Sequence, residues 1–132
     1  MEIYLAEHAG FCFGVKRAME MAESGLAELE GPKYSLGPLI HNPQAVALLE
    51  SRGIKPVKDI GDVGEGNIII RSHGVSPEAI EAADAQGLNV IDATCPFVKR
   101  AQLMAENLYK DGYQVVVVGD LNHPEVVGLV GW

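Results

Sequence analysis

The sequence predicts an α/β fold in which a mainly parallel sheet carries helices on both faces. Short aliphatic runs alternate with segments of helical periodicity along the 132 residues. The run NIII at 67–70 is apolar without alternation, which is typical of a strand buried on both faces. Several helical segments begin at a proline and end before a glycine, as capped helices do. With 48% hydrophobic residues, the chain can bury a genuine core.

The first half alternates strand and helix. Residues 3–6 are predicted to form a short strand, and a helix follows from about residue 15 to 29, where apolar residues recur every three or four positions. A weak strand at 34–36 precedes a second helix. Asn42 can cap that helix, Pro43 can take its first position, and Gly53 can end it.

The second half repeats this order. We expect strands at 54–57, 67–71, 89–92 and 113–120, of which the first is an edge strand and the last, YQVVVVGD, is the strongest of the chain. Helices are predicted from Pro77 and Pro96. The final residues, VVGLVGW, indicate no clear element, so the chain is expected to be truncated within a new β-α unit.

Composition excludes several classes of function. The formal net charge of -8 argues against a nucleic-acid partner, because nucleic acids bind basic surfaces. The N-terminus lacks a basic and apolar leader, and no apolar run is long enough for a membrane span. We therefore expect a cytoplasmic protein that does not associate with a membrane, with cysteines that are reduced.

Two cysteines lie at predicted strand-to-helix junctions, Cys12 in GFCFGVKRA and Cys95 in DATCPFVKR. A single cysteine is more often a small buried residue than a ligand. A thiol at a helix start, however, meets backbone N–H groups and the positive end of the helix dipole, which favour the thiolate. The matching positions of the two cysteines favour metal binding or catalysis.

Three histidines and a glutamate follow other predicted strands: His41 in LIHNP, His73 in RSHGV, and His123 with Glu125 in NHPEV. Because parallel strands end at one edge of a sheet, these side chains and both thiols are expected to gather there. His41 is equally well explained as a loop residue at a helix start, and Glu125 as a first-turn carboxylate. With His123 beside it, Glu125 can also act in a proton relay.

No Cys-x2-Cys spacing, dinucleotide fingerprint or P-loop occurs in the sequence. Metal ligands would therefore have to meet through folding, and any cofactor is expected to be inorganic.

Five motifs in order, GFCFGVKRA, LIHNP, SHGVSP, DATCP and HPEVVG, resemble the N-terminal part of the 4-hydroxy-3-methylbut-2-enyl diphosphate reductases. The resemblance spans nearly the whole chain. It implies an iron-sulfur oxidoreductase of the methylerythritol phosphate route of isoprenoid biosynthesis. Such an enzyme removes the allylic hydroxyl of its diphosphate substrate by reduction, giving isopentenyl and dimethylallyl diphosphates.

The resemblance also implies a role for each residue. Cys12 and Cys95 would be two of three thiolates holding a [4Fe-4S] cluster, whose remaining iron binds the substrate hydroxyl as a Lewis acid. His41 and His73 would bind the diphosphate, His123 would contact it or relay a proton, and Glu125 would donate the proton. Electrons would come from a partner such as ferredoxin or flavodoxin.

Members of this family are more than twice as long, with three α/β lobes around the cluster. By this comparison, residues 1–13 hold the first strand and cysteine loop, 14–95 form the first lobe, and 96–132 are the incomplete start of the second lobe. The third cysteine ligand is missing from this chain, which has two cysteines. We therefore expect the 132 residues alone to be inactive and prone to association.

Two other hypotheses remain. The chain could be a zinc-dependent hydrolase with Cys12, Cys95 and a histidine as ligands and Glu125 as base. It could also be a non-catalytic split lobe that pairs with another chain.

Overall fold

The computed structural model describes residues 1–132, and all elements predicted between residues 13 and 112 are present. The helices are α1 (Phe13–Glu20), α2 (Pro43–Ser51), α3 (Pro77–Ala85), α4 (Pro96–Lys110) and α5 (Pro124–Val130). The strands are β1 (Lys33–Leu36), β2 (Ile54–Val57), β3 (Asn67–Ile70) and β4 (Asn89–Asp92). A π-helical turn, η1 (Met21–Gly25), extends α1, and a 3-10 turn, η2 (Ile60–Asp62), follows β2. None of the helices combines the length and apolar character needed to cross a bilayer.

The four strands form one sheet in the order β2-β1-β3-β4, and all three pairings are parallel. This confirms the predicted parallel α/β sheet. Pro56 has no N–H to donate to a neighbouring strand, and it lies in β2 at the edge of the sheet, where no second partner needs one. All residues of β3 are buried, because this strand lies in the interior of the sheet.

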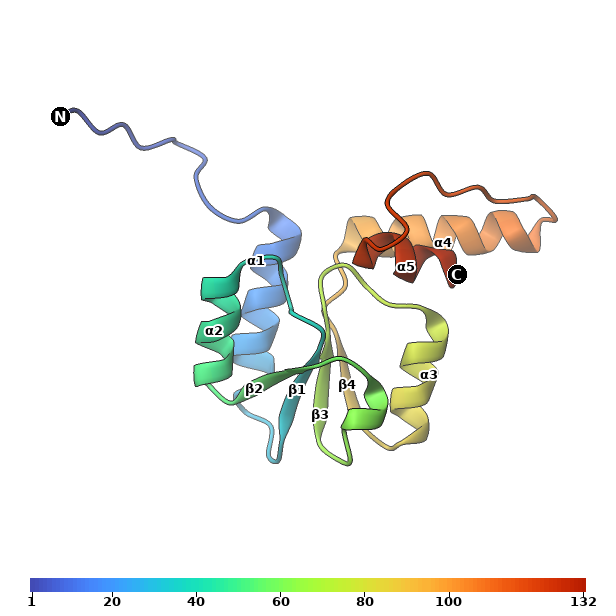
Figure 1. The fold of residues 1–132 in the computed structure, drawn as a ribbon, viewed down its shortest axis with the longest axis horizontal. Helices are drawn as coiled ribbons and strands as arrows, with labels where there is room; N and C mark the ends of the chain where they lie inside the picture. The colour runs from blue at the N-terminus through green and yellow to red at the C-terminus, as the bar shows by residue number, and fades with distance from the viewer.

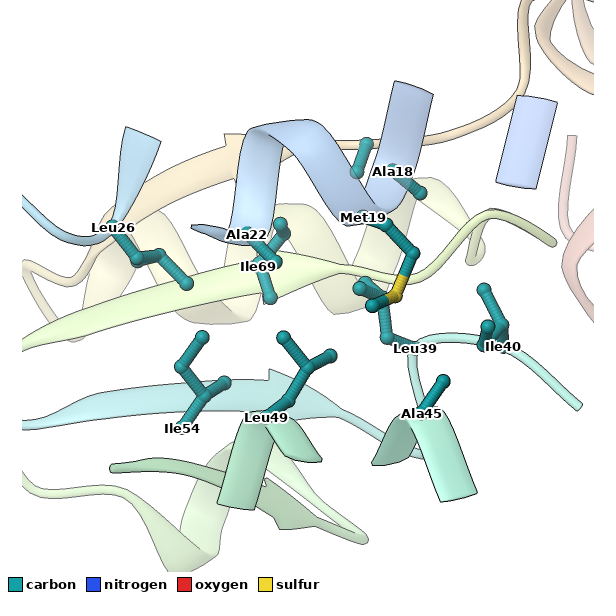
Figure 2. Close-up of a cluster of buried hydrophobic side chains, with 11 residues drawn as sticks. Ala18, Met19, Ala22, Leu26, Leu39, Ile40, Ala45, Leu49, Ile54 and Ile69 are labelled. Atoms are coloured by element: carbon teal, nitrogen blue, oxygen red, sulfur yellow. The ribbon is translucent and has the colours of Figure 1, made fainter. Parts of the chain in front are cut away.

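Helices cover both faces of the sheet, with α1 and α2 on one face and α3 on the other (Figure 1). Figure 2 shows the first core cluster, in which Met19 of α1 and Leu49 of α2 meet Ile69 of β3. Ile68 and Ile70 point to the other face and pack with Ala83 of α3. All members of the two clusters lie between residues 18 and 93. The division of the chain into lobes stays a prediction.

Two predicted strands are absent. Residues 3–6 lie in an exposed N-terminal segment that extends away from the body of the molecule (Figure 1). Residues 113–120 also have no regular structure, and Val116 and Val118 are 76% and 94% exposed. A strand is stable only when its N–H and C=O groups pair with a neighbouring strand. Within these 132 residues neither segment has such a neighbour, so apolar composition alone does not produce a strand.

Helix α5 covers final residues for which no clear element was expected, although the interpretation of Glu125 as a first-turn carboxylate implied a helix start there. It begins at Pro124 with His123 as its N-cap residue, so it follows the same cap-proline pattern as α2, α3 and α4. It packs against α4 near the carboxyl edge of the sheet (Figure 1). The dipeptide His123-Pro124 was the signal that could have identified it.

Candidate functional site

Backbone hydrogen bonds continue the sheet beyond the ends of its strands and hold three loops in register. The Ser72 N–H, after β3, donates to the Leu39 carbonyl at 3.3 Å. The Cys95 N–H, after β4, donates to the Ser72 carbonyl at 2.9 Å. The Ser72 hydroxyl is buried and also donates to Leu39. The loops that carry His41, His73 and Cys95 are therefore fixed to one another by the main chain.

The three predicted histidines meet at this edge. The ring centroids of His41 and His73 lie 4.4 Å apart, and that of His123 lies 5.9 Å from His41 and 5.8 Å from His73. We call these three residues the histidine cluster. His41 and His123 are exposed and His73 is half-buried. The expectation that these side chains gather at the carboxyl edge is thus met by residues from three separate loops.

Local hydrogen bonds orient two of these histidines. The Asn42 side chain, and not the ring of His41, caps α2 by accepting from the Ala45 N–H at 2.9 Å. His41 is therefore free of the capping role that could have explained it. The Nδ1 atom of His123 accepts from the Glu125 N–H at 3.3 Å and caps α5. A ring nitrogen that accepts carries no proton, so Nε2 of His123 is the donor in the neutral ring.

His73 is neutral at physiological pH. Burial, together with the charges of His41, Arg71 and His123, lowers its pKa from 6.5 to about 4. Its Nδ1 atom is buried and has no hydrogen-bond partner. A neutral imidazole can donate one hydrogen bond to an anion, but it does not neutralise charge.

Glu125 is half-buried in the first turn of α5, two residues after His123. A carboxylate is favourable at this position because it lies near the positive end of the helix dipole, which is the simpler interpretation of Glu125. It also places the carboxyl group on the same short segment as a member of the histidine cluster. The two interpretations are compatible, because a carboxyl group at a helix start can still exchange a proton.

The two cysteines are the N-cap residues of α1 and α4. Cys95 lies at a strand-to-helix junction, as predicted, whereas no strand precedes Cys12. Both thiols are free; Cys12 is exposed and Cys95 is half-buried. The first turn of α1 lies against Cys95, because a Cβ atom at Gly14 would lie 2.5 Å from Sγ of that cysteine. Arg17 of α1 adds a hydrogen bond to the Thr94 carbonyl at 3.2 Å.

The thiols suit a soft metal or an iron-sulfur cluster. Nowhere in the chain, however, are three or more His, Cys, Asp or Glu residues placed so that they could hold a metal ion together. Cys12 and Cys95 therefore suit part of the ligand set of such a metal or cluster, but the chain does not complete that set. The zinc hydrolase hypothesis, which requires Cys12, Cys95 and a histidine in one group, is not supported.

Known proteins match this chain closely. A family model described as LytB protein matches residues 3–132. The 4-hydroxy-3-methylbut-2-enyl diphosphate reductase of Geobacter metallireducens is 58% identical over 132 residues, which cover 100% of this chain and 46% of the relative. The reductase of the same name from Aquifex aeolicus is 52% identical over 133 residues, with the same coverage.

Two solved structures share the fold. A structure of (E)-4-hydroxy-3-methyl-but-2-enyl diphosphate reductase matches with a TM-score of 0.84 and 52% identity, covering 98% of this chain and 46% of that chain. The E-1-hydroxy-2-methyl-but-2-enyl-4-diphosphate reductase from Plasmodium falciparum matches with a TM-score of 0.90 and 34% identity, covering 95% and 40%. The chain thus spans about half the length of the relatives it matches. Since the family model matches almost all of its residues, the chain belongs to the LytB family.

Proposed function

We propose that this chain supplies the diphosphate-binding and proton-donating residues of a 4-hydroxy-3-methylbut-2-enyl diphosphate reductase. The observation that carries the proposal is the histidine cluster, with Glu125 beside it, in a chain 58% identical to a reductase of that name. Imidazole N–H groups are suitable donors to phosphate oxygens, and they converge here from three loops.

The roles follow from position. His41, His73 and His123 bind the diphosphate, and Glu125 donates a proton to the allylic hydroxyl. That hydroxyl leaves as water when the C–O bond breaks, because hydroxide is a poor leaving group. Two electrons and a second proton complete the reduction, which gives isopentenyl or dimethylallyl diphosphate. The electrons come from a partner protein such as ferredoxin or flavodoxin.

Cys12 and Cys95 would hold a [4Fe-4S] cluster as two of its ligands, and the remaining protein ligand would come from outside this segment. When bound, the cluster supplies electrons and Lewis acidity. The contact of Gly14 with Cys95 supports this part of the proposal, because it brings the start of the helix that Cys12 caps against the second cysteine. The 132 residues alone would lack a complete ligand set.

A chimera tests the proposal. Residues 1–132 would replace the matching segment of the Aquifex aeolicus reductase, and the protein would be purified anaerobically and reconstituted with iron and sulfide. We expect a coloured protein with bound iron and sulfide that reduces the allylic diphosphate. A folded chimera that stays colourless and inactive, beside an active unaltered reductase, would contradict the proposal. That outcome would instead favour the non-catalytic split lobe.

A further inference from the structure

Helix α5 carries His123 and Glu125, but few polar contacts attach it to the rest of the chain. The segment 114–132, which includes α5, takes part in no ion pair. Its one hydrogen bond to a residue outside the segment runs from the Trp132 indole N–H to the Val75 carbonyl at 3.0 Å. Apart from its packing against α4, the position of α5 therefore depends on contacts at its C-terminal end.

Two glycines at that end lie against the 74–76 segment, which directly follows His73. Gly128 is buried, and a Cβ atom there would lie 3.4 Å from main-chain atoms of the 74–76 segment. A Cβ atom at Gly131 would overlap Cβ of Ser76 and lie 3.3 Å from its Cα atom. The φ of Gly131 is -77°, so the backbone there does not itself require glycine. The glycines are needed for the close approach of the helix to the segment.

Trp132 joins the same end of α5 to two neighbours. The Val75 carbonyl that accepts from its indole N–H lies in the 74–76 segment. That carbonyl also accepts from Nε2 of Gln102 in α4 at 3.4 Å. The ammonium group of Lys99, also in α4, lies 4.2 Å from the centroid of the indole ring, where it is attracted by the face of the ring. Trp132 thus connects α5 to both the 74–76 segment and α4.

These contacts lie close to the histidine cluster. His73 directly precedes the 74–76 segment, and the ring of His123, at the other end of α5, lies 5.8 Å from the ring of His73. The N-terminal end of α5 has only local hydrogen bonds, such as that from the His123 N–H to the Asp120 carbonyl at 2.9 Å. The helix is about 10 Å long, so a displacement of its C-terminal end also moves His123 and Glu125.

We propose that Gly131 and Trp132 are positioning residues for the site. They hold the C-terminal end of α5 on the 74–76 segment, and thereby fix the two site residues of α5 relative to His73. This inference rests on the proposed function, and it adds residues that act through His123 and Glu125. A misplacement of about 1 Å can cost about a hundredfold in rate, so a contact outside the site can control turnover.

Two variants test the contact. Gly131→Ala adds a methyl group that must displace Ser76 or α5, although alanine suits the backbone conformation at this position. Trp132→Phe keeps an aromatic ring but removes the N–H that donates to the 74–76 segment. The matched controls are Gly64→Ala, where nothing lies within 4 Å of a Cβ atom, and Tyr109→Phe, which removes the hydroxyl of an exposed aromatic residue.

The first measurement is NMR of the 132-residue chain. Nuclear Overhauser effects between the ring protons of His73 and His123 report the position of α5. Those between His41 and His73, whose ring centroids lie 4.4 Å apart, are an internal reference that does not involve α5. We expect both variants to weaken or lose the His73–His123 effect and to keep the His41–His73 effect, whereas both controls keep the two effects. A variant that only loses stability would leave their ratio unchanged in its folded fraction.

The second measurement is turnover in the chimera with the Aquifex aeolicus reductase. We expect kcat to fall about tenfold to a hundredfold in each variant, with a smaller change in KM, because His41 and His73 stay in place. Iron and sulfide content should stay unchanged. In a Glu125→Gln chimera the same substitutions should have little further effect, since a residue that acts through Glu125 matters less once the acid is gone. A general structural defect would instead add to the loss.

Each outcome supports or overturns the inference. An unchanged His73–His123 effect, or an active chimera whose kcat neither variant alters, would overturn it and leave the proposed function standing. An unaltered chimera without activity would overturn the proposed function, and the positioning role with it. If Gly131→Ala fails to fold, Trp132→Phe decides, because it removes one hydrogen bond of a half-buried side chain and adds no atoms.

Discussion

Gly14 lies directly against the thiol of Cys95, so that a Cβ atom at position 14 would be 2.5 Å from Sγ and 3.0 Å from Cβ of that cysteine. These are distances that real atoms do not tolerate without a shift. The contact joins the start of α1, capped by Cys12, to the start of α4, capped by Cys95. The relative position of the two thiols thus depends on the absence of a side chain at residue 14.

The first prediction follows from this contact. Gly14→Ala should lower the free energy of unfolding by about 1–3 kcal/mol, because the added methyl group must displace Cys95 or α1. Urea denaturation measures the change. Gly25→Ala is the matched control, since nothing lies within 4 Å of a Cβ at that position. It should be neutral or slightly stabilising, because alanine loses less backbone entropy than glycine. Equal midpoints for the two variants would show that the contact is not close.

The second prediction concerns pH. The pKa of His73 is lowered to about 4 in the folded chain from 6.5, so the folded state binds a proton less readily than the unfolded state. Protonation of His73 therefore costs the folded chain no stability above pH 6.5. The free energy of unfolding falls as the pH is lowered towards 4, because the unfolded state then takes up the proton more readily. Because His73 is only half-buried, we expect a loss of about 1–2 kcal/mol after allowing for solvent screening.

Denaturation of the unaltered chain and of His73→Gln between pH 7 and 4 checks this prediction. Carboxylates also titrate in this range, so the difference between the two slopes is the quantity of interest. His73→Gln should lose less stability on acidification. His8→Gln, in the exposed N-terminal segment, should behave as the unaltered chain does. Parallel curves for all three proteins would mean that His73 titrates normally.

The third prediction concerns the start of α2, next to His41. Asn42→Ala removes the side chain that accepts from the Ala45 N–H, and it should destabilise the chain by about 1 kcal/mol. Ser76→Ala is the control at α3, where the N-cap side chain makes no capping hydrogen bond. Thermal or urea unfolding should show a clearly smaller loss for Ser76→Ala. If the two losses are equal, the Asn42 cap contributes no particular stability.

Features that depend on residues close together in the sequence were predicted better than features that depend on distant residues. Pro43, Pro77 and Pro96 were correctly placed at helix starts, because a capping residue and proline act within one turn. The gathering of the histidines was predicted from topology, since parallel strands end at one edge. The strand at 113–120 was wrong because pairing depends on a distant partner that apolar composition does not reveal.

The remaining site features could not be predicted for a similar reason. The Nε atom of Arg71 is buried without a hydrogen-bond partner, which is visible only in three dimensions. The contact between Gly14 and Cys95 depends on how α1 and α4 meet, which no short motif encodes. The position of Cys95 directly before a helix that starts at Pro96, in contrast, was predicted from the flanking residues.

The last prediction tests the proton donor in the chimera described above. Glu125→Gln keeps the size of the side chain and its place in the first turn of α5, but it removes the transferable proton. Turnover should fall by about a hundredfold or more, the usual contribution of a general acid, while iron and sulfide content stays unchanged. Glu106→Gln is the control, because that carboxylate pairs with Lys110 on α4 and should leave turnover unaltered. A Glu125→Gln chimera with a full cluster and normal turnover would assign the proton to another group, with Nε2–H of His123 the next donor to test.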